Sequence, residues 1–321
     1  MAVVALAGAS LLLAGCSSGA GTRRAVVGAA SSTTTTVPEQ QYPALDPPVP
    51  AEATPPPLAA DWYGQPGDGV WADAGRTVGV ATAVRTTNLR QGDQVLSAAW
   101  ISAAHTSVSL YAGTSQPAGN WSNDGAVPPS LQDNLLATFN GGFQLDASEG
   151  GWYADGRQAF PLRDGAASLV IRADGSATVA EWGRDASLTP DVVAVRQNLK
   201  LLVDGGAVTA LSASPSPNQV WGQTLFGRVL TWRSALGIDS SGDLIYLAGP
   251  NLDPPTLAAA MVAVGGVRAM QLDINPMWVS FDSLTGTIPA VAGTKLIEGM
   301  NFPPDHFLSP FWRDFVAVFA R

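Results

Sequence analysis

The chain has 321 residues, of which 46% are hydrophobic, 13% are charged and 34 are glycine. This composition can bury a large core, and its many glycines and few charges favour a strand-rich or mixed fold. The net charge of −9 argues against a nucleic-acid partner and excludes a polybasic membrane patch.

Residues 1–16 are typical of a bacterial lipoprotein signal peptide. The segment from Ala2 to Gly15 is almost uninterrupted small and apolar, and it is too short to span a bilayer comfortably. It ends in Leu13-Ala14-Gly15-Cys16, which resembles a lipobox in which Cys16 is lipidated; the alternative is an uncleaved anchor. No Lys or Arg precedes this run, so we expect a basic segment upstream of residue 1. Cys16 is the only cysteine, which excludes an intrachain disulfide.

Residues 17–60 are typical of a disordered Ser/Thr/Pro-rich tether. A Ser/Thr run spans residues 31–36, and many prolines follow it with too few large apolar residues to pack. Such a segment is extended and flexible, and it holds a domain away from a membrane. We therefore expect an exported protein, lipid-anchored at the outer face of the cytoplasmic membrane, with a globular domain over residues 61–321.

The first strands of this domain are expected at 95–101 and 107–111, where β-branched and aromatic residues are dense. We expect these two strands to pair, with His105 as a turn residue in their connection and not as a ligand.

A buried strand then ends at Asn140-Gly141-Gly142. Asn tolerates the left-handed backbone region and Gly enters it without steric cost, so this stretch predicts a tight turn with outward-facing amide groups that could cradle an anion. The alternative is a loop that merely needs positive φ. A polar loop with two carboxylates, Asp146 and Glu149, follows; such loops close over substrate in some proteins and are simply solvated surface in most.

The middle of the chain predicts a hairpin over 167–182, turning at Asp174-Gly175. The segment 191–203 fits a strand or a helix, and we favour a strand after Gln197. A second hairpin is expected over 231–248, with Arg233 near its start and Asp239 at its turn. Arginine offers a planar donor fork that suits phosphate or carboxylate.

A helix is expected from Pro254 to about Val264, because proline stands in its first turn and glycine follows its last. The strand after it, 267–273, delivers Asp273 to its carboxyl end. These elements together predict one α/β domain of the α+β kind, strand-rich, with a few helices packed on the sheet.

The order of these motifs is similar to that of the phosphodiester glycosidase family. The carrying residues are Asn140-Gly141-Gly142-Phe143, then Arg233-Ser234-Ala235-Leu236-Gly237-Ile238-Asp239, then the Ala-rich helix and Ala269-Met270-Gln271-Leu272-Asp273. The resemblance covers residues 81–321. The family includes the uncovering enzyme, which removes N-acetylglucosamine from a sugar-1-phosphodiester, and many bacterial envelope proteins.

One stretch departs from the family pattern. Where the family usually continues in glycines after Leu-Asp, this chain has Asp273-Ile274-Asn275-Pro276. Glycine amides that could approach a phosphate are replaced by bulkier residues and by a proline without an N–H. Either the substrate differs or activity is lost.

The resemblance implies an envelope hydrolase that cleaves the glycosidic bond of a sugar-1-phosphodiester. Its carboxylate candidates are Asp273, Asp239 and Glu298, with a hairpin-turn role as the alternative for Asp239. The substrate or phosphate ligands would be Asn140, Gly141, Gly142, Arg233 and Asn275.

No cofactor is implied, and a divalent cation is possible but no ligand spacing specifies it. His306 is expected to be a loop residue. The alternative function is a non-catalytic glycan-binding lipoprotein that keeps the fold. An open pocket with Asn140, Arg233 and Asp273 would favour the enzyme, whereas a pocket filled by Met277 or Trp278 would favour the binder.

Overall fold

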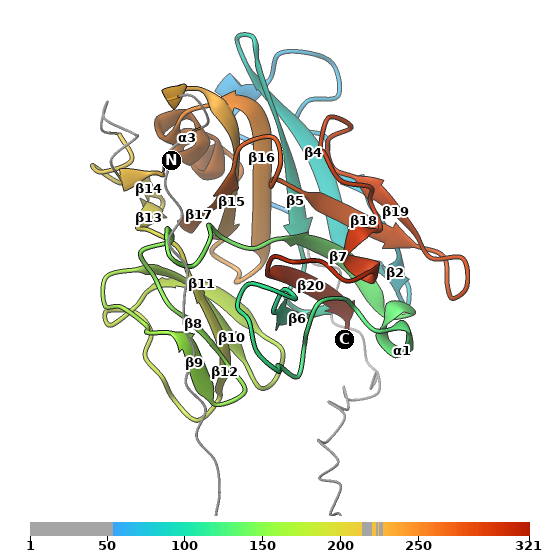
Figure 1. The fold of residues 1–321 in the computed structure, drawn as a ribbon. Coiled ribbons are helices and arrows are strands. Elements are labelled where there is room, and N and C mark those ends of the chain that lie inside the picture. Colours follow the sequence, from blue (N-terminus) through green and yellow to red (C-terminus); the bar gives the residue numbers. More distant parts are fainter. Residues whose placement is uncertain (1–53, 214–219, 223, 225–226) are drawn as a thin grey trace, which may run out of the picture. The chain divides into compact units, whose positions relative to one another are not determined.

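The computed structural model describes residues 54–213, 220–222, 224 and 227–321 (Figure 1). The predicted signal peptide, Cys16 and most of the expected tether lie outside these residues. The described end of the tether packs on the domain, since Leu58 is buried and the amide of Ala59 donates to the carbonyl of Ala263 at 2.9 Å. Packed chain thus begins a few residues before Asp61.

The largest sheet has eight strands in the order β1-β4-β5-β16-β15-β17-β13-β14 (Figure 1). Every pairing between its strands is antiparallel. Their bounds are β1 Ala72–Asp73, β4 Val84–Gln91, β5 Gln94–Ile101, β13 Leu201–Asp204, β14 Ala207–Val208, β15 Thr231–Ile238, β16 Leu244–Leu252 and β17 Arg268–Ile274.

Two five-stranded antiparallel sheets accompany it. The first has the order β11-β10-β12-β8-β9 and the second β19-β18-β7-β20-β6, while β2 Thr77–Val78 and β3 Ala81–Thr82 form a separate pair. The bounds are β6 Thr106–Tyr111, β7 Leu135–Asn140, β8 Trp152–Ala154, β9 Arg157–Phe160, β10 Ala167–Arg172, β11 Ala177–Glu181, β12 Val192–Gln197, β18 Phe281–Thr285, β19 Ala292–Lys295 and β20 Phe315–Ala320.

Helices are few among the described residues. The ten-residue helix α3, Pro254–Ala263, lies against β16, β13 and β15, while α1 Pro129–Gln132 and the 3-10 turns η1 Ala60–Trp62 and η3 His306–Leu308 are short. The predicted helix is confirmed to within a residue: the Asp253 side chain caps it by accepting from the amide of Thr256 at 2.9 Å.

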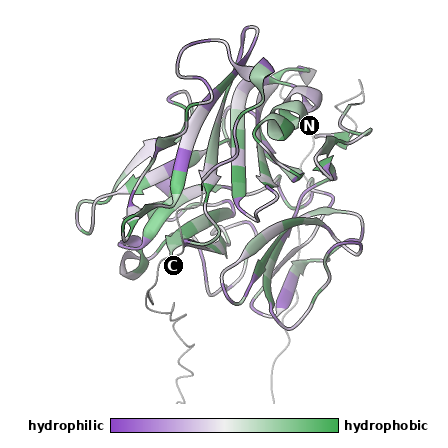
Figure 2. Ribbon diagram, turned by 180° about the vertical axis from the view of Figure 1, so that it is seen from behind, coloured by the Kyte–Doolittle hydropathy of each residue, from purple (hydrophilic) through white to green (hydrophobic). Residues whose placement is uncertain are grey.

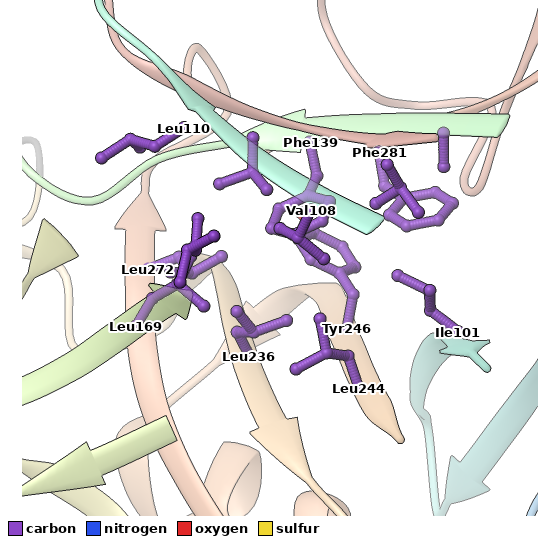
Figure 3. Close-up of a cluster of buried hydrophobic side chains, with 14 of the residues drawn as sticks. Ile101, Val108, Leu110, Phe139, Leu169, Leu236, Leu244, Tyr246, Leu272 and Phe281 are labelled. Carbon is purple, nitrogen blue, oxygen red and sulfur yellow. The ribbon is translucent and has the colours of Figure 1, made fainter. Parts of the chain in front are cut away.

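The large sheet is buried on both faces because side chains alternate along a strand. On β16, Ile245 and Leu247 pack under α3 with Leu257, whereas Leu244 and Tyr246 point to the opposite face. That opposite face meets residues of both five-stranded sheets in one cluster, which includes Val108, Phe139, Leu169 and Phe281 (Figure 3). Hydrophobic stretches accordingly lie on the strands and on α3 in Figure 2.

The strand-rich mixed fold expected from the sequence therefore fits loosely, as sheets dominate. Both predicted hairpins are confirmed, as β10–β11 and β15–β16. The segment 191–203 holds two strands, β12 and the start of β13, which belong to different sheets and are separated by a corner where Leu199 has a φ of 54°.

The expected pairing of the first two strands is wrong. β5 pairs with β4 and β16 in the large sheet, whereas β6 pairs with β20 in another sheet. The turn between them is the place where the chain changes sheets, and His105 lies in it as predicted. The physical reason is that other strands occupy both edges of β5. Only two residues, including Gly92, join β4 to β5, so these two strands form a local hairpin along one edge, and β16 pairs along the other.

In the part of the chain that the structure describes, no helix is both long and apolar enough to cross a bilayer.

Candidate active site

A pocket of about 580 Å³ is lined by the loop after β7, the end of β17 with the segment after it, and a residue just before β20. This volume lies within the usual range for small-molecule sites. Its wall combines acidic, basic, amide and aromatic side chains: Phe143, Gln144, Ala147, Glu149, Leu199, Val220, Gly222, Asp273, Ile274, Asn275, Trp278 and Arg313.

Asp273 is the buried carboxylate of this wall, with 6% of its surface exposed. β17 carries it to the pocket, and its Oδ1 accepts from the amide of Ile274 at 2.8 Å. Its backbone carbonyl accepts from the Ser234 hydroxyl at 2.9 Å, which ties β17 to β15. Burial raises the pKa of Asp273 to about 6, although the Arg313 guanidinium acts in the opposite direction. The charge of this carboxyl therefore changes near pH 6, above the usual range of an aspartate.

Arg313 is the cation of the pocket, and the sequence reasoning missed it. Its Nη2 donates to Asp273 Oδ2 at 2.6 Å and to the carbonyl of Gly142 at 2.9 Å. Its guanidinium also lies over the Trp278 ring, 4.8 Å from the ring centre. The Nε is buried and has no hydrogen-bond partner among the described residues. A guanidinium in a pocket wall suits an anionic oxygen.

A second buried ion pair supports the same wall from behind. Arg196 Nε donates to Asp314 Oδ2 at 2.6 Å, and both side chains are 1% exposed. The remaining donors of Arg196 reach the carbonyls of Gln197, at 2.7 Å, and Phe143. The pair therefore joins β12, the start of β20 and the loop after β7, which is the loop that forms one side of the pocket.

Asn140, at the end of β7, makes hydrogen bonds to several neighbouring segments and is not part of the pocket wall. Its Oδ1 accepts from the Tyr246 hydroxyl at 2.9 Å and from the amide of Ser280 at 3.0 Å. Its Nδ2 donates to the Gly141 carbonyl at 2.8 Å and to the Ser234 hydroxyl at 3.2 Å. These bonds use its side-chain donors and acceptors within the protein, and its predicted role as a ligand stays a prediction.

The two glycines after Asn140 are required for space and not for positive φ. Neither is among the residues with positive φ, so that part of the sequence reasoning is wrong. A Cβ on Gly141 would lie 2.6 Å from Asp314 Oδ2, and one on Gly142 would lie 3.0 Å from Asn198 Cγ. The amide of Gly141 already donates to the Asp314 carbonyl at 3.1 Å, so it does not face outward.

Arg233 is not among the wall residues and is fully buried. Its Nε donates to the Leu252 carbonyl at 2.9 Å and its Nη1 to Gln271 Oε1 at 2.9 Å, while Nη2 has no partner among the described residues. Burial lowers the pKa of Arg233 to about 10. The geometry places this cation inside the sheet, so a direct contact with phosphate would need the surrounding chain to move.

The other two candidate carboxylates are not brought to Asp273. Asp239 accepts from the amides of Ser241 and Asp243 at 2.8 and 3.0 Å, which is the arrangement of a hairpin-turn residue. It follows Ile238, which is paired with Arg268 at the far end of β17, roughly 17 Å from Asp273 at the usual strand rise. Glu298 is exposed in the loop after β19.

Three further wall residues supply an amide, a carboxylate and an aromatic ring to the pocket. Asn275, a predicted ligand, lies in the wall with a φ of 73°, and its Oδ1 accepts from the Thr231 hydroxyl at 3.3 Å. Glu149 belongs to the polar loop identified from the sequence, and it supplies a second carboxylate to the wall. Trp278 lines the pocket without filling it, and Met277 is 44% exposed outside the wall.

No group of three His, Cys, Asp or Glu side chains suited to a metal occurs within the described ranges. His306 lies in η3 with its ring against Phe302 and Phe307. Burial lowers its pKa to about 4. Neither histidine belongs to the pocket.

No family model and no curated protein matches the chain. Among solved structures, one similar chain is the zebrafish N-acetylglucosamine-1-phosphodiester alpha-N-acetylglucosaminidase catalytic domain, auto-inhibited by its pro-peptide. It has 14% identity and a TM-score of 0.45, covering 78% of this chain and 87% of that one.

A hypothetical protein from Synechocystis has 12% identity and a TM-score of 0.40, covering 78% of this chain and 64% of that one. A Burkholderia pseudomallei protein whose description proposes export has 14% identity and a TM-score of 0.30, covering 76% and 75%. These similarities are remote.

Proposed function

We propose that this protein is a hydrolase of the cell envelope that cleaves the glycosidic bond of a sugar-1-phosphodiester. The observation that carries the proposal is the contact between Asp273 and Arg313 in the wall of one open pocket. Hydrolysis at an anomeric carbon needs negative charge near the carbon, and departure of a phosphate ester needs positive charge near its oxygens. The motif order described above supports the same reaction.

In this reaction the oxygen of a water molecule forms a bond to the anomeric carbon. The bond between that carbon and the phosphate oxygen breaks, and its electron pair leaves with the phosphate. A proton of the water passes to a carboxylate, and the products are the free sugar and a phosphate monoester. The leaving group is a weak base, so the reaction does not depend on a strong general acid.

The roles follow from the positions of the side chains. Asp273, ionised above a pH of about 6, stabilises the positive charge that develops at the sugar or accepts the proton of the water. Glu149 is the second carboxylate available for that proton. Arg313, the cation of the wall, binds a phosphate oxygen. Arg233, fully buried, supports the wall through its hydrogen bond to the Trp221 carbonyl, which lies between the wall residues Val220 and Gly222.

The cellular part of the proposal rests on the sequence. Cys16 would carry the lipid and residues 17–60 would hold the domain off the membrane. The partner is then an envelope glycan that carries a sugar phosphodiester, and the membrane is contacted through the lipid alone.

The test is an activity screen of the full-length protein, purified in detergent, against sugar-1-phosphodiesters that differ in the sugar. Release of free sugar is expected for at least one of them. In Asp273→Asn, kcat should fall about 10²-fold with little change in KM, because the amide keeps the shape and removes the charge. In Arg313→Ala, KM should rise at least as much as kcat falls. Both variants are first checked for folding by circular dichroism.

An Asp273→Asn protein that is folded and turns over substrate at the wild-type rate would remove Asp273 from the mechanism. Exposed Glu298, outside the pocket wall, is the matched control, and Glu298→Gln should leave both constants unchanged.

A non-catalytic glycan-binding module is the second candidate. It is favoured by the Trp278 ring in the pocket wall and by the internal hydrogen bond of the Gly141 amide, which leaves that donor unavailable to a phosphate. Calorimetric binding of a sugar phosphodiester without any release of sugar would support this module over the enzyme.

A further inference from the structure

A group of stacked aromatic rings adjoins the pocket. Trp312 stacks on Phe311 with ring centres 4.6 Å apart and an interplanar angle of 26°. The rings of Trp278 and Phe302 meet Trp312 edge-on, at centre distances of 6.1 and 5.9 Å. Three neighbours therefore fix the orientation of the Trp312 ring.

Trp312 is nevertheless 44% exposed, whereas Phe311 and Arg313 on either side of it are 7% and 5% exposed. Phe311 covers one face of the indole, so the exposed surface lies on the rest of the ring. Exposure of a large apolar ring to water costs free energy, which a ligand that covers the ring would recover. Because neighbouring rings already fix the indole, binding would not have to reduce the conformational entropy of this side chain. These are the properties of a preformed binding surface.

The exposed ring is continuous with the pocket. Trp278, which touches Trp312, lines the pocket, and so does Arg313, the next residue in the chain. A ligand that occupies the pocket and extends past Trp278 would reach the exposed surface of Trp312. Such a ligand needs polar groups for Asp273 and Arg313 and an apolar face for the indole.

We propose that Trp312 forms a subsite for a second sugar ring, so that the substrate is an extended glycan and not a single sugar phosphate. A pyranose matches both requirements, because its hydroxyl groups bind polar side chains while its C–H face stacks on an aromatic ring. The net charge of −9 disfavours nucleic-acid bases, which also stack on tryptophan. This inference rests on the proposed function, since it takes the pocket to hold a sugar.

The test measures binding of two non-hydrolysable phosphonate analogues of a sugar-1-phosphodiester, one with a methyl group and one with a sugar ring beyond the phosphonate. Calorimetry is done on the full-length wild type and on Trp312→Ala. The wild type should bind the two-ring analogue about tenfold more tightly than the one-ring analogue. Trp312→Ala should lose this preference and bind the one-ring analogue as the wild type does.

The matched control is Tyr63→Ala, since Tyr63 is 46% exposed and its hydroxyl donates to the Leu58 carbonyl instead of facing the pocket wall. It should keep the preference. A Trp312→Ala protein that keeps the preference, or a wild type that shows none, would overturn the subsite. A loss of binding to phosphatidylglycerol vesicles in Trp312→Ala, with unchanged analogue binding, would make the ring a membrane contact and also overturn it.

Analogue binding and turnover are separate readouts. A wild type that prefers the two-ring analogue but hydrolyses no phosphodiester would support the subsite and contradict the proposed hydrolase. A wild type that hydrolyses phosphodiesters but binds both analogues equally well would support the proposed hydrolase and contradict the subsite.

Discussion

The ion pair between Arg196 and Asp314 should be one of the strongest single contributions to the integrity of the pocket wall. In Arg196→Met the apolar stem is kept and the guanidinium is removed. The Asp314 carboxylate, 1% exposed, then stays buried without the donor that lies 2.6 Å from its Oδ2. The carbonyls of Phe143 and Gln197 also lose the Arg196 donor.

The expected cost follows from this burial. Removing one partner of a buried ion pair typically destabilises a protein by about 3 to 5 kcal/mol, because an uncompensated charge is left in a low dielectric. For a domain of this size roughly 2 to 4 °C in Tm corresponds to 1 kcal/mol. Arg196→Met should therefore lower the Tm by about 6 to 20 °C.

The assay is urea unfolding followed by tryptophan fluorescence, with thermal unfolding as a second probe. Arg172→Met is the control, because its pair with Asp191 is exposed, with side chains 37% and 55% accessible, and such pairs contribute less than about 1 kcal/mol. The double variant Arg196→Met/Asp314→Leu should be less destabilised than the sum of the single variants, since it leaves no buried charge.

An Arg196→Met protein that unfolds within about 1 kcal/mol of wild type, as Arg172→Met should, would refute this reasoning. It would mean that the Asp314 carboxylate finds water or another donor at low cost.

Four other predictions follow from the same structure. As pH falls from about 6.5 towards 4, the free energy of unfolding of the wild type, measured in urea, should fall by about 3 kcal/mol relative to that of His306→Phe. Burial lowers the pKa of His306 to about 4 in the folded state, so over this pH range the unfolded state binds a proton that the folded state does not. The kcat/KM for a sugar phosphodiester should decline as pH falls below about 6, where Asp273 becomes protonated; a flat profile would argue against a carboxylate role. Gly141→Ala should cost about 1 to 3 kcal/mol, since its Cβ would lie 2.6 Å from a carboxylate oxygen, and a wild-type Tm would contradict this. Cys16→Ala should abolish labelling by a fatty-acid analogue in cells that express the protein, and equal labelling of wild type and variant would exclude lipidation at Cys16.

Local sequence signals determined the elements whose form depends on neighbours in the chain. The helix α3 was predicted from Pro254, Pro255 and the glycines after Val264, because capping and proline geometry act within one turn. The hairpins β10–β11 and β15–β16 were predicted from Gly175 and from the turn after Asp239 for the same reason. The position of Asp273 at the end of a strand was also predicted locally, whereas Asn275 became a candidate through the family resemblance; both line the pocket.

Only the tertiary structure decided which strands pair and which charges meet. β5 and β6 are neighbours in sequence yet lie in different sheets, because pairing is chosen among all available edges. Arg313 and Asp273 are 40 residues apart and bond at 2.6 Å, and Arg196 reaches Asp314 over 118 residues. The burial of Arg233 could not be predicted either, because the local sequence around an arginine does not show whether its side chain contacts solvent or buried carbonyl groups. Long-range contacts of this kind depend on how the sheets stack, which no local propensity encodes.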